Sequence, residues 1–148
     1  MEYTEKAQYI IGSISLLANK LSTFGDSWLP DITYRQWFLL ILLKHMGSAE
    51  KTVNSIALFS GTSRQNVKKM LTALEHKAYV NIAPSTVDGR ALNVTLTEKS
   101  LAYFAEHGAR AEQMTRSLFR DFNLDELNQV CAFLDTFQER LDEMRESS

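Results

Sequence analysis

Residues 55–97, SIALFSGTSRQNVKKMLTALEHKAYVNIAPSTVDGRALNVTLT, decide the fold of this chain. They predict, in order, a helix, a tight turn, a second helix and two strands that are joined by a short loop. Ser63 is a hydroxyl residue immediately before the second helix, where it can cap the first turn. This order of elements is typical of a winged helix-turn-helix.

The two predicted strands form a hairpin, the wing. In the later strand, apolar residues alternate with polar ones, which is the period of a half-buried strand. The earlier strand supplies apolar partners at Val80 and Ile82. Residues 84–90 should therefore project as a loop. The alternating residues are Leu92, Asn93, Val94, Thr95 and Leu96.

The second helix has two chemically different faces. Val67, Met70, Leu71 and Leu74 fall on one side at helical spacing and should be buried. Basic and amide side chains lie opposite, and such a face can enter the major groove of DNA. We expect DNA contacts from the first turn, from this face and from the wing: Ser63, Arg64, Gln65, Asn66, Lys68, Lys69, Thr72, Asp88 and Arg90.

Each of these features also has a simpler interpretation. Any amphipathic helix has a solvated polar face, and Asp88-Gly89 is common in ordinary turns. In a wing, Arg90 could enter a narrow minor groove, with Asp88 bracing it or another basic side chain. The helix and the wing together favour the DNA interpretation.

The segment before residue 33 predicts a long amphipathic helix. Its apolar residues recur every three or four positions, from Ala7 to Phe24. Gly25, Asp26, Ser27 and Pro30 then predict a loop over residues 25–32. Thr33 and Gln36 form a capping box for the next helix, which is apolar on all sides from residue 37 to 43 and should end at Gly47.

The segment after the wing predicts two more helices. The first is capped by Thr97 and extends to about residue 122, and the last begins near Asn123 with Glu126 as its capping partner. The last helix carries a strict apolar stripe, which needs partner helices. The terminal helices could pack on each other within one chain, but we favour a two-fold interface between two copies, made by Ile10, Ile14, Leu17, Leu127, Val130, Leu134, Phe137 and Leu141.

The composition fits a globular protein. With 148 residues, 45% hydrophobic and 23% charged, the chain suits a single domain, with dimerisation helices at about 1–32 and 98–148 and a DNA-binding region at about 33–97. The net charge of -2 divides unevenly: six basic residues against three acids over 60–100, and two against eight over 121–148. The basic part is the predicted DNA-binding part. The acidic N-terminus and the short apolar runs predict a cytoplasmic protein without a signal peptide or membrane segment.

The chain resembles the MarR family of bacterial transcriptional regulators over nearly its whole length. The matching residues in the helix-turn-helix are Ile56-Ala57, Gly61, Ser63-Arg64, Val67 and Leu74-Glu75. Those in and after the wing are Tyr79-Val80, Asp88-x-Arg90-Ala91 and Leu96-Thr97-Glu98-Lys99.

The resemblance implies a mainly α fold with a small β-hairpin wing, and an obligate homodimer with interlocking terminal helices. It further implies recognition helices in successive major grooves and control by a small ligand or by oxidation. Two positions depart from the family pattern, because Ala78 and Ser100 stand where glycine is common. A positive φ at Ala78 would cost about 1 kcal/mol.

Three kinds of effector can be weighed. Redox control would need Cys131, but a single cysteine beside an apolar stripe is more typical of a buried structural residue. His45, His76 and His107 are far apart, so neither a metal site nor a cofactor is expected. A small aromatic ligand remains, bound among Trp28, Tyr34, Trp37 and Phe38, although core packing would also explain these side chains.

The sequence therefore predicts a DNA-binding transcriptional regulator, a repressor that binds a near-palindromic operator as a homodimer. The alternative is a winged-helix module that binds protein and has lost DNA binding. Retention of Arg64, Lys68, Lys69 and Arg90 argues against that alternative. An enzyme is not expected, because the sequence contains no phosphate loop, metal-ligand spacing or nucleophile-base pair.

Overall fold

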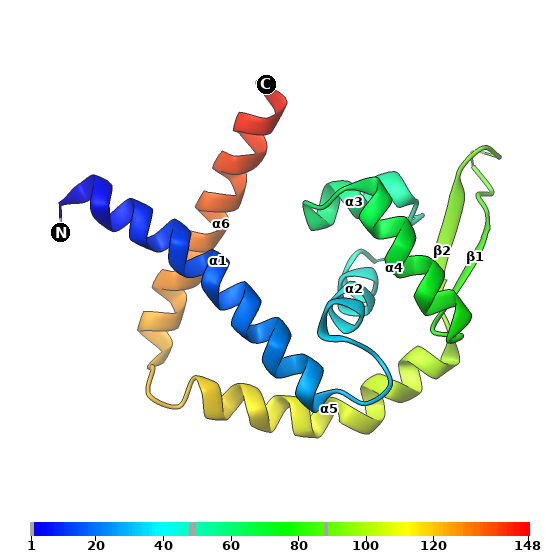
Figure 1. Cartoon of the computed structure of the whole chain (residues 1–148), viewed down its shortest axis with the longest axis horizontal. Helices are drawn as coiled ribbons and strands as arrows, with labels where there is room; N and C mark the ends of the chain where they lie inside the picture. The colour runs from blue at the N-terminus through cyan, green and yellow to red at the C-terminus, as the bar shows by residue number, and fades with distance from the viewer. Residues whose placement is uncertain (1, 48–49, 88) are drawn as a thin grey trace. The chain divides into compact units, whose positions relative to one another are not determined.

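The computed structural model describes residues 2–47, 50–87 and 89–148. Helices and strands follow one another in the predicted order, with a helix-turn-helix and a hairpin between long terminal helices (Figure 1). The chain divides into two compact units, one that ends at Tyr103 and one that begins at Phe104. The elements are α1 (Tyr3–Trp28), α2 (Tyr34–His45), α3 (Val53–Ser60), α4 (Arg64–His76), β1 (Val80–Pro84), β2 (Leu92–Leu96), α5 (Glu98–Leu118) and α6 (Leu124–Glu146).

Helix α1 is longer than the sequence predicts. The prediction of a loop from Gly25 is wrong, since α1 continues to Trp28. Gly25 is buried against the side chain of Tyr34, and a Cβ at this position would lie 2.3 Å from Tyr34 Cδ2. Glycine is present here for close packing between α1 and α2 rather than to break a helix.

Helix α2 supplies the centre of the core. The predicted capping box is confirmed: the Thr33 side chain accepts from the amide of Gln36, and the Gln36 side chain accepts from the amide of Thr33. Leu39, Leu40 and Leu43 are at most 2% exposed. Burial of this face fixes α2 against the winged region, because interiors are closely packed.

A tight turn joins α3 to α4. Gly61 ends α3 with φ 72°, a left-handed conformation that glycine adopts readily. Ser63 then caps α4, and its side chain accepts from the amide of Asn66 at 3.1 Å. The Ser63 cap was predicted from the sequence, whereas the left-handed end of α3 at Gly61 was not.

The strands β1 and β2 pair in antiparallel fashion, with Val80 opposite Leu96 and Ile82 opposite Val94. The segment before α3 is hydrogen-bonded to this hairpin, since the amide of Val94 donates to the carbonyl of Lys51 at 2.8 Å. Val94 is fully buried, whereas Leu92 is 47% exposed. The predicted alternation of buried apolar and exposed polar residues in β2 therefore fails at Leu92, the end of the strand nearer the wing loop.

Helix α4 ends in a Schellman motif, in which Tyr79 N–H donates to Leu74 C=O and Ala78 N–H donates to Glu75 C=O. Ala78 has a φ of 65°, so alanine occupies the left-handed position that glycine usually fills. Ser100 also stands where the family pattern often has glycine. Its side chain has a structural role there, because the buried hydroxyl donates to the carbonyl of Tyr79.

In the second unit, α5 ends at Leu118, about four residues before the predicted end. Asn123 and Glu126 form the predicted capping box of α6. No residue of this 23-residue helix is buried, although the helix carries an apolar stripe. Among the described residues, no helix is both long enough and apolar enough to cross a membrane.

Candidate nucleic-acid interface

Helix α4 is held by its apolar side and presents its polar side to solvent. Val67, Leu71 and Leu74 are at most 1% exposed. Close packing of these three side chains fixes the rotation of α4 about its axis. Met70, which was also expected on this buried side, is only half-buried. The residues of α4 that were predicted to contact DNA are all exposed: Arg64, Gln65, Asn66, Lys68, Lys69 and Thr72.

Two of these polar side chains also have partners inside the chain. Asn66 Nδ2 donates to Thr62 Oγ1 at 3.1 Å, and the Thr72 hydroxyl donates to the carbonyl of Lys68 at 2.9 Å. Thr72 therefore offers a base its methyl group and its oxygen lone pairs, but not its proton. Gln65, Lys68 and Lys69 remain the stronger candidates for groove contacts.

The wing brings a second cationic group close to α4. A pocket of about 300 Å³ is lined by Arg64 and Lys68 of α4 and by Arg90 of the wing. The sequence did not show that these three cations share one hollow. The other lining residues come from the start of α3 and from the wing: Thr52, Val53, Asn54, Ala91 and Leu92.

This pocket has the chemistry of an anion site. Three basic side chains around a concave surface concentrate positive potential, and guanidinium groups bind phosphate oxygens with good geometry. Arg90 is exposed, as a groove contact requires. Asp88, which we expected to brace it, lies outside the described residues.

Two of the six basic residues of segment 60–100 lie beside an acidic side chain and not at the pocket. Lys77 and Lys99 lie 3.9 Å from the carboxylate of Asp31, in the loop between α1 and α2. Lys99 Nζ also lies 4.4 Å from the ring centre of Tyr79. The cationic surface near the pocket is therefore smaller than the segment charge suggests.

Asp31 is the centre of a cluster that sequence reasoning missed. The Tyr79 hydroxyl donates to Asp31 Oδ2 at 2.5 Å, and Asp31 has a φ of 66°. The hydrogen bond from Tyr79 lowers the pKa of Asp31, opposed by desolvation and assisted by Lys77 and Lys99. Tyr103 adds a further tie by donating to the carbonyl of Pro30 at 2.9 Å. The cluster joins the α1–α2 loop to the end of α4 and the start of α5.

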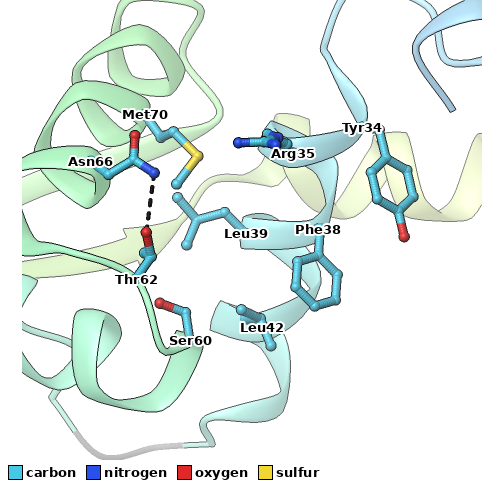
Figure 2. Close-up of a pocket in the computed structure, with 9 residues that line it drawn as sticks. All are labelled: Tyr34, Arg35, Phe38, Leu39, Leu42, Ser60, Thr62, Asn66 and Met70. Carbon is cyan, nitrogen blue, oxygen red and sulfur yellow. Dashed lines mark hydrogen bonds between the residues drawn. The ribbon is translucent and has the colours of Figure 1, made fainter. Parts of the chain in front are cut away.

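A second pocket, of about 190 Å³, lies between α2, the α3–α4 turn and α4 (Figure 2). Of the four aromatic residues predicted to bind a ligand, Tyr34 and Phe38 line this pocket. Their rings are stacked, with centroids 6.3 Å apart. Trp28 and Trp37 are not part of the lining. The complete lining is Tyr34, Arg35, Phe38, Leu39, Leu42, Ser60, Thr62, Asn66 and Met70.

The single cysteine does not lie where the sequence predicted. Cys131 is exposed rather than buried, because no residue of α6 is buried within one copy of the described chain. Within the described part of the chain, no three histidine, cysteine or acidic side chains gather as metal ligands.

The known proteins most informative for this chain are regulators of the MarR family. Residues 32–92 match the model of that family, and no curated protein matches. A MarR/EmrR family transcriptional regulator from Acinetobacter sp. ADP1 shares 21% identity with a TM-score of 0.80, and the match covers 93% of this chain and 97% of that one.

Two further solved structures were obtained with DNA or concern ligand control. A mutant MarR from E. coli in complex with operator DNA is 19% identical with a TM-score of 0.76, covering 93% of this chain and 99% of the other. BpsR from Bordetella bronchiseptica, whose DNA binding is regulated by 6-hydroxynicotinic acid, is 20% identical with a TM-score of 0.72, covering 88% and 98%. At such identities the likeness establishes the fold. Residues 32–92 thus carry the MarR-family sequence pattern, within a chain that has the winged helix-turn-helix fold of MarR-family regulators.

Proposed function

We propose that this protein is a sequence-specific DNA-binding transcriptional regulator, and that it represses by occupying a near-palindromic operator as a homodimer. The observation that carries the proposal is the shared hollow of Arg64, Lys68 and Arg90, which combines recognition helix and wing in one cationic surface. A helix of this kind reads base edges in the major groove, while the wing arginine enters the adjacent minor groove.

The apolar stripe of α6 supports the homodimer. Val130, Leu134 and Leu141 are 54%, 39% and 52% exposed, and Leu17 of α1 is 56% exposed. Exposed apolar side chains in a continuous stripe mark an interaction surface. Two copies related by a two-fold axis would present two recognition helices, which explains the expectation of a palindromic operator.

The pocket between α2 and α4 supports control by a small aromatic ligand. Its wall includes Tyr34 and Phe38, and Asn66 and Met70 of its wall belong to the recognition helix (Figure 2). Burial raises the pKa of Tyr34, whose ring forms part of the apolar wall. A ligand that fills this pocket would shift α4 relative to α2 and weaken operator binding.

The test is titration against the intergenic DNA upstream of the gene at two salt concentrations, beside random duplex of equal length. We expect preferential binding of a dimer, with affinity that falls steeply as salt rises. Arg90→Ala should weaken binding about tenfold or more, while its matched control Arg120→Ala, which removes an exposed cation outside the proposed interface, should bind nearly as the wild type does.

Equal affinity for both duplexes would exclude specific binding to this upstream DNA. If the dimer were intact and bound neither duplex, the protein-interaction alternative would replace the proposal. An equal loss for Arg90→Ala and Arg120→Ala would show that Arg90 contributes only net charge.

A further inference from the structure

Glu50, in the connection between α2 and α3, makes three hydrogen bonds to the wing. One carboxylate oxygen, Oε1, accepts from the amide of Thr86 at 3.0 Å and from its hydroxyl at 3.1 Å. The other oxygen accepts from the hydroxyl of Ser85. A residue 36 positions away in the sequence therefore holds the point where β1 leads into the wing loop.

These bonds continue into the loop itself. Ser85 is buried, and its Oγ accepts from the amide of Val87 at 3.1 Å. Its own amide donates to the carbonyl of Ala91 at 2.9 Å, across the loop. The carboxylate of Glu50 thus fixes Ser85, whose hydroxyl accepts from Val87 and whose amide donates to Ala91, next to Arg90.

The neighbouring residue holds the other strand of the hairpin. Lys51 N–H donates to Asn93 Oδ1 at 2.9 Å, and Lys51 C=O accepts from Val94 N–H at 2.8 Å. Backbone bonds at Lys51 fix β2, and side-chain bonds at Glu50 fix the end of β1. The hairpin is therefore anchored on both strands, and Glu50 supplies the anchor nearer the tip.

The charge of Glu50 is the wrong sign for a direct role in DNA binding. A carboxylate close to DNA repels phosphates, so its negative charge alone weakens binding. Its hydrogen bonds from Ser85 and Thr86 lower its pKa, and it is ionised at neutral pH. An acid at this position is explained by its capacity to accept three hydrogen bonds at once.

We propose that Glu50 is a positioning residue for DNA recognition: it orients the wing so that Arg90 is directed at the minor groove. The inference rests on the proposed function, since it assigns the wing a role in binding DNA. Electrostatics and positioning predict opposite signs for the loss of Glu50. Removal of a negative charge should strengthen binding, whereas loss of the wing anchor should weaken it.

Two substitutions separate these effects. Glu50→Gln and Glu50→Ala remove the same charge, but glutamine keeps an oxygen that accepts from Thr86 and an amide that reaches Ser85. We expect Glu50→Ala to bind the operator at least about fivefold more weakly than Glu50→Gln, and more weakly than the wild type. Ser85→Ala, which leaves the charge unchanged, should weaken binding in the same direction but to a smaller extent.

The same pair in an Arg90→Ala background tests whether Glu50 acts through the wing arginine. The operator affinities of the two Glu50 variants should then become equal, because the Arg90 guanidinium that Glu50 is proposed to position is absent. Hydrogen exchange at Thr86 and Val87 should be faster in Glu50→Ala than in Glu50→Gln in both backgrounds. A general loss of structure would instead leave the difference in affinity unchanged when Arg90 is absent.

Equal affinity of Glu50→Gln and Glu50→Ala in a protein that otherwise binds its operator would overturn the inference. If both variants bound more tightly than the wild type and equally so, Glu50 would act through charge alone. If the wild type did not prefer the upstream DNA over random duplex, the failure would lie with the proposed function at that DNA and not with the role of Glu50.

Discussion

Helices α4 and α6 have similar amphipathic sequences and opposite surroundings. In α4, the apolar side is complete within the chain, with Val67 and Leu74 fully buried. In α6, none of the 23 residues is buried, and Val130 and Leu141 are about half exposed. The comparison shows that a stripe of apolar residues predicts burial but does not say whether the partner surface belongs to the same chain.

The difference assigns separate tasks to the two helices. The core behind α4 must be rigid within each copy, because the polar face opposite it is the proposed reader of DNA. The stripe of α6 is the proposed contact between copies. Burial of its apolar side chains would contribute to stability only when two copies associate. Changes in the two helices should therefore be distinguishable by experiment.

The largest expected effect comes from placing a charge in the α6 stripe. Leu134→Glu should convert the dimer to a monomer, because a carboxylate in an apolar interface is strongly unfavourable. Operator affinity should fall about 100-fold or more once the two half-sites are no longer bound together. Analytical ultracentrifugation and DNA titration measure the two effects. The control Gln129→Glu adds the same charge at an exposed position of α6 outside the stripe and should remain dimeric; a dimeric Leu134→Glu would refute the interface.

A smaller effect is expected from truncating the buried side of α4. Leu71→Ala should lower the free energy of unfolding by about 2 to 5 kcal/mol, because it leaves a cavity at a side chain that is 1% exposed. Urea denaturation provides the measurement. Leu58→Ala removes the same atoms from a side chain that is 67% exposed and should change stability by less than about 0.5 kcal/mol. Similar losses for both variants would mean that α4 is not fixed by its core.

The smallest effect concerns the tie between the end of α4 and Asp31. The pKa of Asp31 is lowered from 3.8, so the ionised form stabilises the folded state above this value, and the contribution disappears as the pH falls through the folded pKa. Asp31→Asn should lower the melting temperature by about 1 to 4 °C at pH 7, an estimate that allows for solvent screening of this exposed side chain. Below pH 3.8 the difference from the wild type should shrink and then vanish. A difference that stayed constant as the pH fell well below that value would show that the carboxylate charge is not responsible.

The parts of the fold that depend on neighbours in sequence were predicted well. The caps Thr33, Ser63 and Asn123 are confirmed, because a cap bonds amides only two or three positions ahead. Gly25 was misjudged, since its helix-breaking tendency is outweighed by contact with Tyr34 on another helix. The exposed face of α4 and its N-terminal cap were predicted correctly, but their contact with bases remains a prediction.

Interactions between distant residues escaped prediction. Asp31 meets Tyr79 across 48 positions, and Glu50 meets Thr86 across 36. No periodicity marks such pairs, because each is set by the path of the folded backbone. Cys131 was wrongly predicted to be buried: it is exposed on α6, and the apolar stripe beside it does not say which surface covers it.

Ala78 has a consequence for how this protein can change over generations. Its φ of 65° is a conformation in which glycine is favoured by about 1 kcal/mol. A substitution on the side of α4 proposed to read DNA will often reduce stability. Ala78→Gly lies outside the proposed reading surface and would restore about the same free energy of unfolding. This single substitution would therefore allow destabilising changes on the reading surface to be tolerated.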